Sequence, residues 1–127
     1  MNSNNGEETA IRKALEDYYF KGIYEGDTDL LRKVYAKKDI LVFGDVDGQP
    51  YFKTIEQYLD GVKNRKSPKE QGSTFKPEII SIRQVNTIAV AELQVKMYQF
   101  DYHEFLSFHK LDGSWVIVNK MLTDEKK

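Results

Sequence analysis

The pair Asp112-Gly113, near the end of a 127-residue chain, constrains the fold more than any other feature of the sequence. Two apolar-rich stretches, residues 104–111 and 114–121, flank it. Asp-Gly is one of the strongest short-range signals for a two-residue hairpin turn, because both turn residues must adopt positive φ. Such a turn also fixes which side chains lie opposite each other across the two strands. The sequence therefore predicts a C-terminal β-hairpin and indicates which of its residues face the interior.

The order of the remaining segments predicts the fold class. Apolar residues recur every three or four positions in three segments of the first half, which predicts helices at 11–23, 30–35 and 55–62. A short hairpin that turns at Asp47-Gly48 separates the last two helices. Four long strands are expected after them, at 75–84, 87–98, 103–111 and 114–122. Helices first and antiparallel strands last predict an α+β fold with a curved antiparallel sheet wrapped around three helices.

Length and composition set the outer limits. The chain is long enough for one domain, 1–127, in which we expect residues 1–6 to be flexible and the polar stretch 64–73 to be a mobile loop. The net charge of −1 argues against binding of nucleic acid or an anionic membrane surface, and no apolar run reaches the length of a membrane span. The absence of cysteine excludes disulfides and thiolate metal sites. Without the features of a signal peptide at the start, a cytoplasmic location is the default expectation.

The register of the hairpins predicts what faces the helices. With the Asp-Gly turn, Leu106 is expected opposite Asn119 and Glu104 opposite Met121. With a second turn at Phe100-Asp101, one face of the sheet is almost entirely apolar. Its members are Ala89, Ala91, Leu93, Val95, Met97, Glu104, Leu106, Phe108, Trp115, Ile117, Asn119 and Met121. Glu104 and Asn119 are the polar exceptions, and a buried carboxylate must be paired or hydrogen-bonded.

These two residues are the candidate catalytic groups. Glu104 is either a general acid or base in a dry pocket, or a structural acid tied to a tyrosine hydroxyl. Asn119 either donates a hydrogen bond to a substrate carbonyl or satisfies a neighbouring group. The side chains expected to contact a ligand are Tyr18, Tyr35, Tyr58, Met97, Phe108 and Trp115, although aromatic residues at helical spacing are also ordinary core. No cofactor or metal is expected, since His103 and His109 on one strand would lie nearly 20 Å apart at about 3.3 Å per residue.

The outer face of the sheet is mixed in polarity. This composition is typical of a twofold homodimer interface. The residues expected there are Val90, Glu92, Phe105, His109, Val116 and Val118, with His109 hydrogen-bonded to Glu92 of the same chain or of the second copy.

Two stretches carry a resemblance to known proteins. The first helix with Tyr18 and the run Gly22-Ile-Tyr-Glu-Gly-Asp27, followed by Leu30-Leu-Arg32, resembles the opening of the nuclear transport factor 2-like superfamily. Residues 105–120 are similar to its putative lumazine-binding (SnoaL-like) branch. The resemblance implies a cone of cystatin-like topology, in which a curved antiparallel sheet surrounds helices and pairs through its outer face. The superfamily includes isomerases, dehydratases, polyketide cyclases and binding modules without activity. Members of the branch often have aspartate where this chain has Glu104.

Three functions are compatible with these patterns. The first is binding of a small apolar or aromatic molecule between sheet and helices. The second is a cofactor-independent isomerase, dehydratase or cyclase in which Glu104 shuttles a proton. The third is a non-catalytic homodimer module whose cavity is filled by its own side chains.

Overall fold

In the part of the chain that the structure describes, the helices come before four of the six strands. A computed structural model describes residues 4–37 and 39–125. A continuous helical run of α1 (Asn4–Ala14), η1 (Leu15–Phe20) and α2 (Lys21–Glu25) ends at Gly26, which adopts the left-handed conformation with φ 68°. The other helices are α3 (Thr28–Arg32), α4 (Ile55–Asn64) and α5 (Pro68–Gln71). Asp27 accepts a hydrogen bond at the start of α3, and Thr54 and Gln57 form a reciprocal capping box at the start of α4.

Six strands form one sheet in the described part of the chain. They are β1 (Leu41–Val46), β2 (Gln49–Thr54), β3 (Phe75–Val85), β4 (Ile88–Met97), β5 (Phe100–Leu111) and β6 (Ser114–Asp124). Their order across the sheet is β2-β1-β6-β5-β4-β3. The predicted α+β class is confirmed. The expectation of a fully antiparallel sheet is wrong at one place, because β1 pairs with β6 in parallel.

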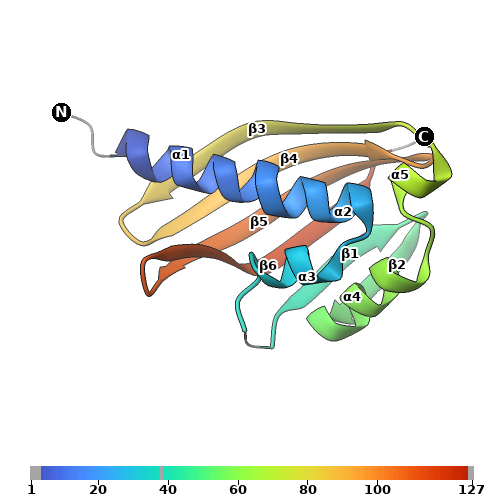
Figure 1. Ribbon diagram of the computed structural model, residues 1–127, viewed down its shortest axis with the longest axis horizontal. Coiled ribbons are helices and arrows are strands. Elements are labelled where there is room, and N and C mark those ends of the chain that lie inside the picture. The colour runs from blue at the N-terminus through green and yellow to red at the C-terminus, as the bar shows by residue number, and fades with distance from the viewer. Residues whose placement is uncertain (1–3, 38, 126–127) are drawn as a thin grey trace.

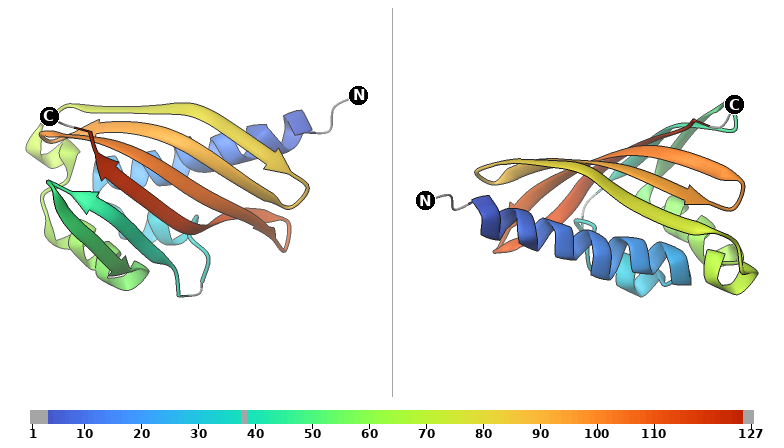
Figure 2. Two further views of the ribbon diagram at one scale, coloured as in Figure 1. Left: turned by 180° about the vertical axis from the view of Figure 1, so that it is seen from behind. Right: turned by 90° about the horizontal axis from the view of Figure 1, so that it is seen from above.

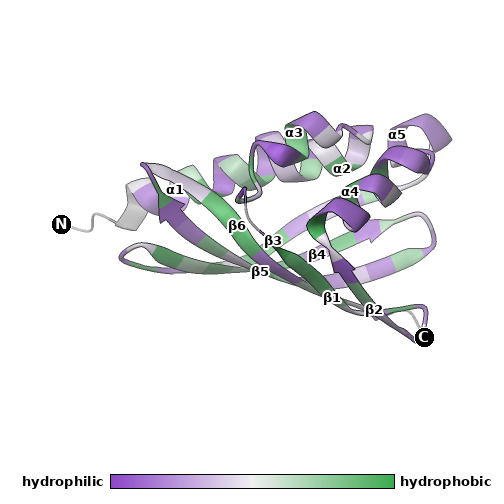
Figure 3. Cartoon of the chain, turned by 90° about the horizontal axis from the view of Figure 1, so that it is seen from below, coloured by the Kyte–Doolittle hydropathy of each residue, from purple (hydrophilic) through white to green (hydrophobic). Residues whose placement is uncertain are grey.

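The helices all lie on one side of the curved sheet (Figures 1 and 2). The long helical run crosses the inner face obliquely, α4 packs against β1 and β2, and α5 lies beside α2 (Figure 1). Coloured by hydropathy, the strands under the helices carry much of the apolar character, and the helices are polar on their outer sides (Figure 3). Leu15, Leu93, Leu106 and Ile117 are fully buried between the two layers. No helix among residues 4–37 and 39–125 is both long and apolar enough to cross a membrane.

Two predicted loop segments differ from the expectation. Of residues 1–6, expected to be flexible, 1–3 lie outside the described residues and 4–6 belong to α1. The stretch 64–73, expected to be a loop, contains α5, because Ser67 accepts a hydrogen bond from the Glu70 backbone and Gly72 ends the helix in the left-handed conformation. Pro68 at the first helical position fits this geometry.

The hairpin at Asp112-Gly113 is confirmed, with Leu111 opposite Ser114 and φ positive at both turn residues. The preceding turn is at Tyr98-Gln99 and not at Phe100-Asp101, since Met97 pairs with Phe100. The shift leaves every inward-facing residue of β4 and β5 inward-facing, because it moves the register by an even number of residues.

The register of β6 changes in mid-strand. Phe108 pairs with Ile117, as expected, but Ser107 pairs with Asn119, so that Val118 is an extra residue in β6. An extra residue of this kind is a β-bulge, which reverses the alternation of the side chains that follow it. Beyond the bulge, the inward and outward positions of β6 are the opposite of those expected.

Candidate functional site

The bulge removes one predicted site residue from the interior and brings in a residue that was not predicted to lie there. Leu106 pairs with Lys120 and not with Asn119, and Glu104 pairs with Leu122 and not with Met121. Asn119 therefore lies on the outer face, where it is half-buried, so its predicted place beneath the helices is wrong. Lys120, expected on the outer face, is buried in the interior with 2% of its surface exposed.

Glu104 and Lys120 form the centre of a buried polar network. The Tyr19 hydroxyl donates a hydrogen bond of 2.5 Å to Oε1 of Glu104, whose side chain is 2% exposed. The ammonium of Lys120 lies 3.8 Å from Oε2 of Glu104 and donates a 3.0 Å hydrogen bond to the Tyr58 hydroxyl. Nζ of Lys120 also lies over two rings, 5.0 Å from the centre of Tyr19 and 4.5 Å from that of Tyr58. The buried carboxylate is thus both paired and hydrogen-bonded, as a buried charge requires.

Burial and charge together set the protonation states of this network. Burial raises the pKa of Tyr19 and of Tyr35, and the nearby Glu104 carboxylate raises both further. For Lys120, burial lowers the pKa, but the Glu104 carboxylate and then the Tyr58 phenol oppose it, and the net shift is upward. Near neutral pH, Lys120 is therefore an ammonium ion, which is a cation and hydrogen-bond donor and not an amine nucleophile.

A pocket of about 230 Å³ opens onto this network. Its walls come from α4, the β1–β2 hairpin, the ends of β4 and β5, and β6. The aromatic side chains that line it are Tyr51, Tyr58 and Tyr102, and the charged ones are Lys53, Arg65, Glu104 and Lys120. Burial raises the pKa of Tyr51 and of Tyr102. Aromatic walls with a few convergent polar groups are typical of small-molecule sites.

Two other depressions among the described residues are not bordered by a buried charged side chain. One of about 420 Å³ lies between α3 and α4 and is bordered by the ion pair of Arg32 and Glu56, which is exposed. A groove of about 540 Å³ on the outer face of the sheet is mostly apolar and includes Val85 and Ile88. We take the smaller pocket as the candidate site because a buried carboxylate and a buried ammonium border it.

The structure brings only some of the predicted ligand contacts together. Tyr58 and Met97 line the pocket with Glu104. Tyr35 lies just behind them, with its ring centre 6.1 Å from that of Tyr58. Its buried hydroxyl has no hydrogen-bond partner in the part of the chain that the structure describes.

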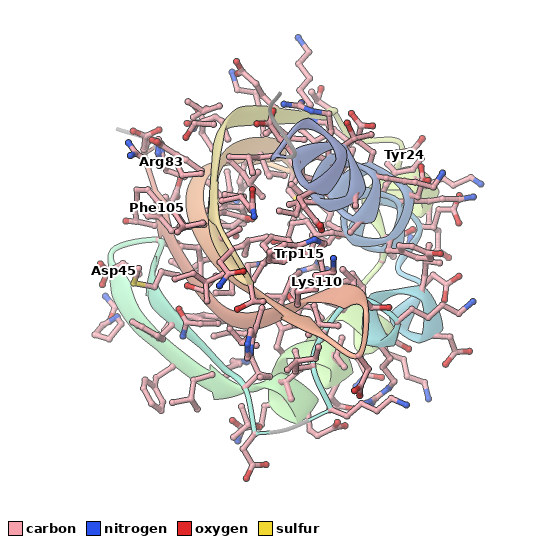
Figure 4. All side chains as sticks on the ribbon, turned by 90° about the vertical axis from the view of Figure 1, so that its left-hand side faces the viewer. Tyr24, Asp45, Arg83, Phe105, Lys110 and Trp115 are labelled. Carbon is pink, nitrogen blue, oxygen red and sulfur yellow. The ribbon has the colours of Figure 1, made fainter. Side chains whose placement is uncertain are left out.

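Three other predicted contacts lie elsewhere. Tyr18 is half-buried on the helical run and does not line the pocket, whereas Tyr19 and Phe20 of the π-helical segment η1 are buried. Phe108 and Trp115 are buried farther along the sheet. Nε1 of Trp115 donates a hydrogen bond to Glu7 of α1, and Figure 4 shows Trp115 between the sheet and that helix.

Comparison with known proteins identifies the family of the chain. The model of the family described as "Putative lumazine-binding" matches residues 6–123. The chain belongs to this family. None of the proteins with curated descriptions matches it significantly.

Solved structures similar to this member of the putative lumazine-binding family are described as nuclear transport factor 2-like proteins of unknown function. One from Shewanella baltica OS155 is 25% identical, with a TM-score of 0.85 over 100% of both chains. One from Silicibacter pomeroyi DSS-3 is 17% identical, with a TM-score of 0.86 over 98% of this chain and 100% of the other. One from Methylobacillus flagellatus KT is 23% identical, with a TM-score of 0.83 over 99% and 96%. The resemblance predicted from the sequence is confirmed.

For this family member, the network predicts a loss of stability at alkaline pH. The pKa values of Tyr19, Tyr35 and Lys120 are all raised in the folded state, from ordinary values of 10.0 for tyrosine and 10.5 for lysine. Above these values the unfolded chain binds fewer protons than the native protein, so the free energy of unfolding falls as pH rises. Urea unfolding at increasing pH measures the fall, and phenolate absorbance should show these tyrosines ionising only as the protein unfolds. Complete ionisation of every tyrosine in the folded protein at its ordinary value would contradict the prediction.

Proposed function

We propose that this chain binds a small organic molecule in the pocket between α4 and the sheet. The observation that carries the proposal is the convergence of Glu104, Lys120 and Tyr58 on a 230 Å³ space with aromatic walls. This space is smaller than the roughly 300 Å³ at which pockets for drug-sized ligands begin, so it suits a ligand of one ring. The family description, lumazine binding, is compatible with a flat ligand and enters the proposal only as support.

Gly61 of α4 offers a direct test, because it lines the pocket and a Cβ added there would have no heavy atom within 4 Å. We expect Gly61→Trp to fill the pocket and to weaken binding of one-ring compounds by about 100-fold. Gly61→Ala, the matched control, should retain binding and stabilise the helix by about 0.5–1 kcal/mol. The probes are benzoate, benzamide and phenol, followed by nuclear magnetic resonance through the Met97 methyl group. Equal binding to both variants would place the ligand elsewhere.

The second candidate function is proton shuttling by Glu104. The specific observation in its favour is that Glu104 borders the pocket while its oxygens are held by Tyr19 and Lys120. An oriented carboxylate beside a bound substrate is the arrangement required of a general base. An isomerase or dehydratase of this kind would lose turnover in Glu104→Gln but keep substrate binding, whereas a binding protein shows no turnover in either form.

We also propose that a second copy of the chain covers the outer face of the sheet. Val90, Phe105 and Met121, on three adjacent strands, are each about 40% exposed there. Figure 4 shows Phe105 on the side of the sheet away from α1. Adjacent apolar side chains of this kind are typical of an interaction surface, and a twofold interface uses the same patch twice.

Within one chain, the predicted contact between His109 and Glu92 is wrong, and its alternative across the proposed dimer stays a prediction. Glu92 lies opposite Phe105, and its carboxylate is 2.6 Å from Nε2 of His103, not hydrogen-bonded to His109. His109 is opposite Ile88 and borders the apolar groove.

Light scattering coupled to size-exclusion chromatography tests the dimer. At micromolar concentration we expect the mass of two chains, and Phe105→Glu should give the mass of one with unchanged circular dichroism. A monomeric wild-type protein would refute the dimer and leave the pocket proposal intact.

A further inference from the structure

The charges around the pocket do not cancel. Three cationic side chains, Lys53, Arg65 and Lys120, line it against one carboxylate, Glu104. Lys120 and Glu104 compensate each other at 3.8 Å. Within residues 4–37 and 39–125, no carboxylate forms a salt bridge with Lys53 or Arg65. Lys53 instead lies over the ring of Tyr51, with Nζ 5.3 Å from its centre. The open part of the pocket therefore carries a net positive charge.

Arg65, which follows α4, has hydrogen-bond donors without partners. Its Nε and Nη2 atoms are buried, and neither has a hydrogen-bond partner among the residues that the structure describes. Its guanidinium carbon lies 5.4 Å from the ring centre of Tyr98, so that this ring supports one face of the group. A buried donor without a partner costs about 1–3 kcal/mol, and more when it is charged. These two atoms have almost no accessible surface, so a bound anion would remove this cost by drawing the guanidinium edge toward the pocket that Arg65 lines.

The positions of Nε and Nη2 within the guanidinium indicate which shape of anion they could bind. Nε and Nη2 form one edge of the guanidinium, and their N–H bonds point in the same direction. A carboxylate accepts both bonds at once through its two oxygens. Lysine would offer a point charge without this paired geometry. Arg65 is therefore suited to a planar anion with two acceptor oxygens.

The tyrosines that line the pocket indicate which kind of molecule bears the carboxylate. The rings of Tyr51, Tyr58 and Tyr102 border the same space, and aromatic side chains pack favourably with an aromatic ligand in offset or edge-to-face arrangements. The volume of about 230 Å³ leaves room for little more than one ring and its substituents. We propose that the ligand of this pocket is a small aromatic carboxylate, with its carboxylate on Arg65 and its ring among the tyrosines. This inference rests on the proposed function and specifies its ligand class.

A pair of probes of equal shape tests the inference. Benzoate and benzamide differ in charge but hardly in size, and their dissociation constants can be compared by nuclear magnetic resonance titration of the Met97 and Leu122 methyl groups. We expect benzoate to bind at least ten-fold more tightly than benzamide. Arg65→Gln should reduce the preference to less than three-fold. Arg65→Lys, which keeps the charge and loses the paired donors, should give an intermediate value and serves as the second variant if Arg65→Gln is unstable.

Lys21→Gln is the matched control, because it removes the same charge from an exposed position on α2. It should leave the preference for benzoate unchanged. Benzamide binding as tightly as benzoate would overturn the carboxylate inference and leave the proposed small-molecule function standing. An undiminished preference in Arg65→Gln would overturn the role of Arg65. If neither probe perturbs the pocket methyl groups, the aromatic-carboxylate class is excluded. The proposed small-molecule function is then decided by a crystallographic screen that includes neutral and cationic one-ring compounds.

Discussion

Replacement of Glu104 by glutamine is expected to lower the free energy of unfolding by about 3–5 kcal/mol, the usual cost of removing one partner of a buried ion pair. Glutamine preserves the volume of the side chain and can still accept the hydrogen bond from Tyr19. It removes the negative charge 3.8 Å from the ammonium of Lys120, a residue that is 2% exposed and whose charge would remain buried without a counter-charge. Urea unfolding near neutral pH measures the difference.

Two further variants separate charge compensation from general disturbance. Glu56 accepts two hydrogen bonds of 2.8 Å from Arg32, but the pair is exposed, so Glu56→Gln should change stability little. Lys120→Met alone should lower the free energy of unfolding. The double variant that carries both Glu104→Gln and Lys120→Met should lose less free energy than the sum of the two single losses. A loss in Glu104→Gln no larger than that in Glu56→Gln would contradict the network.

Gly44→Ala is expected to be the second most disruptive change, with a loss of about 3 kcal/mol. Gly44 lies in β1 opposite Leu122 of β6, and its φ is 146°. A Cβ at this position would lie 1.7 Å from the Leu122 carbonyl oxygen, which is backbone and cannot move aside cheaply. The variant combines backbone strain with overpacking, each of which costs about 1–3 kcal/mol. The melting temperature should fall by about 10 °C.

Gly48→Ala is the matched control for this effect. Gly48 also has positive φ, 76°, but a Cβ there would meet no heavy atom within 4 Å. Its replacement introduces backbone strain alone and should cost about 1 kcal/mol. Equal losses in Gly44→Ala and Gly48→Ala would show that the close approach of β1 to β6 is absent. Because that pairing holds the β1–β2 hairpin beside the pocket, Gly44→Ala should also weaken ligand binding.

The features that could be predicted from the sequence are those set by local chemistry. The turn at Asp112-Gly113 requires positive φ at both residues, and Asp-Gly supplies it at little cost. The capping box at Thr54 likewise depends on residues three positions apart. The burial of Glu104 followed from alternation along β5, which contains no reversal before the hairpin.

The features that could not be predicted depend on contacts between distant segments. The extra residue Val118 has no local signature, since a valine in a bulge resembles a valine in a regular strand, yet it decides whether Asn119 or Lys120 enters the interior. Helical spacing likewise does not decide between Tyr18 and Tyr19, and in the structure Tyr19 is the fully buried one. Arg65 lay in a polar stretch expected to be a loop, and only the fold places it on the pocket.

The central claim is that the space between α4 and the sheet is the ligand site, and a crystallographic fragment screen tests it most directly. Crystals of the chain would be soaked with a diverse set of one-ring compounds that includes neutral, anionic and cationic members. We predict that the bound fragments gather in the pocket lined by Tyr58, Glu104 and Lys120. A pocket that stays without fragments while they bind to the outer-face groove or other surface depressions would contradict the account.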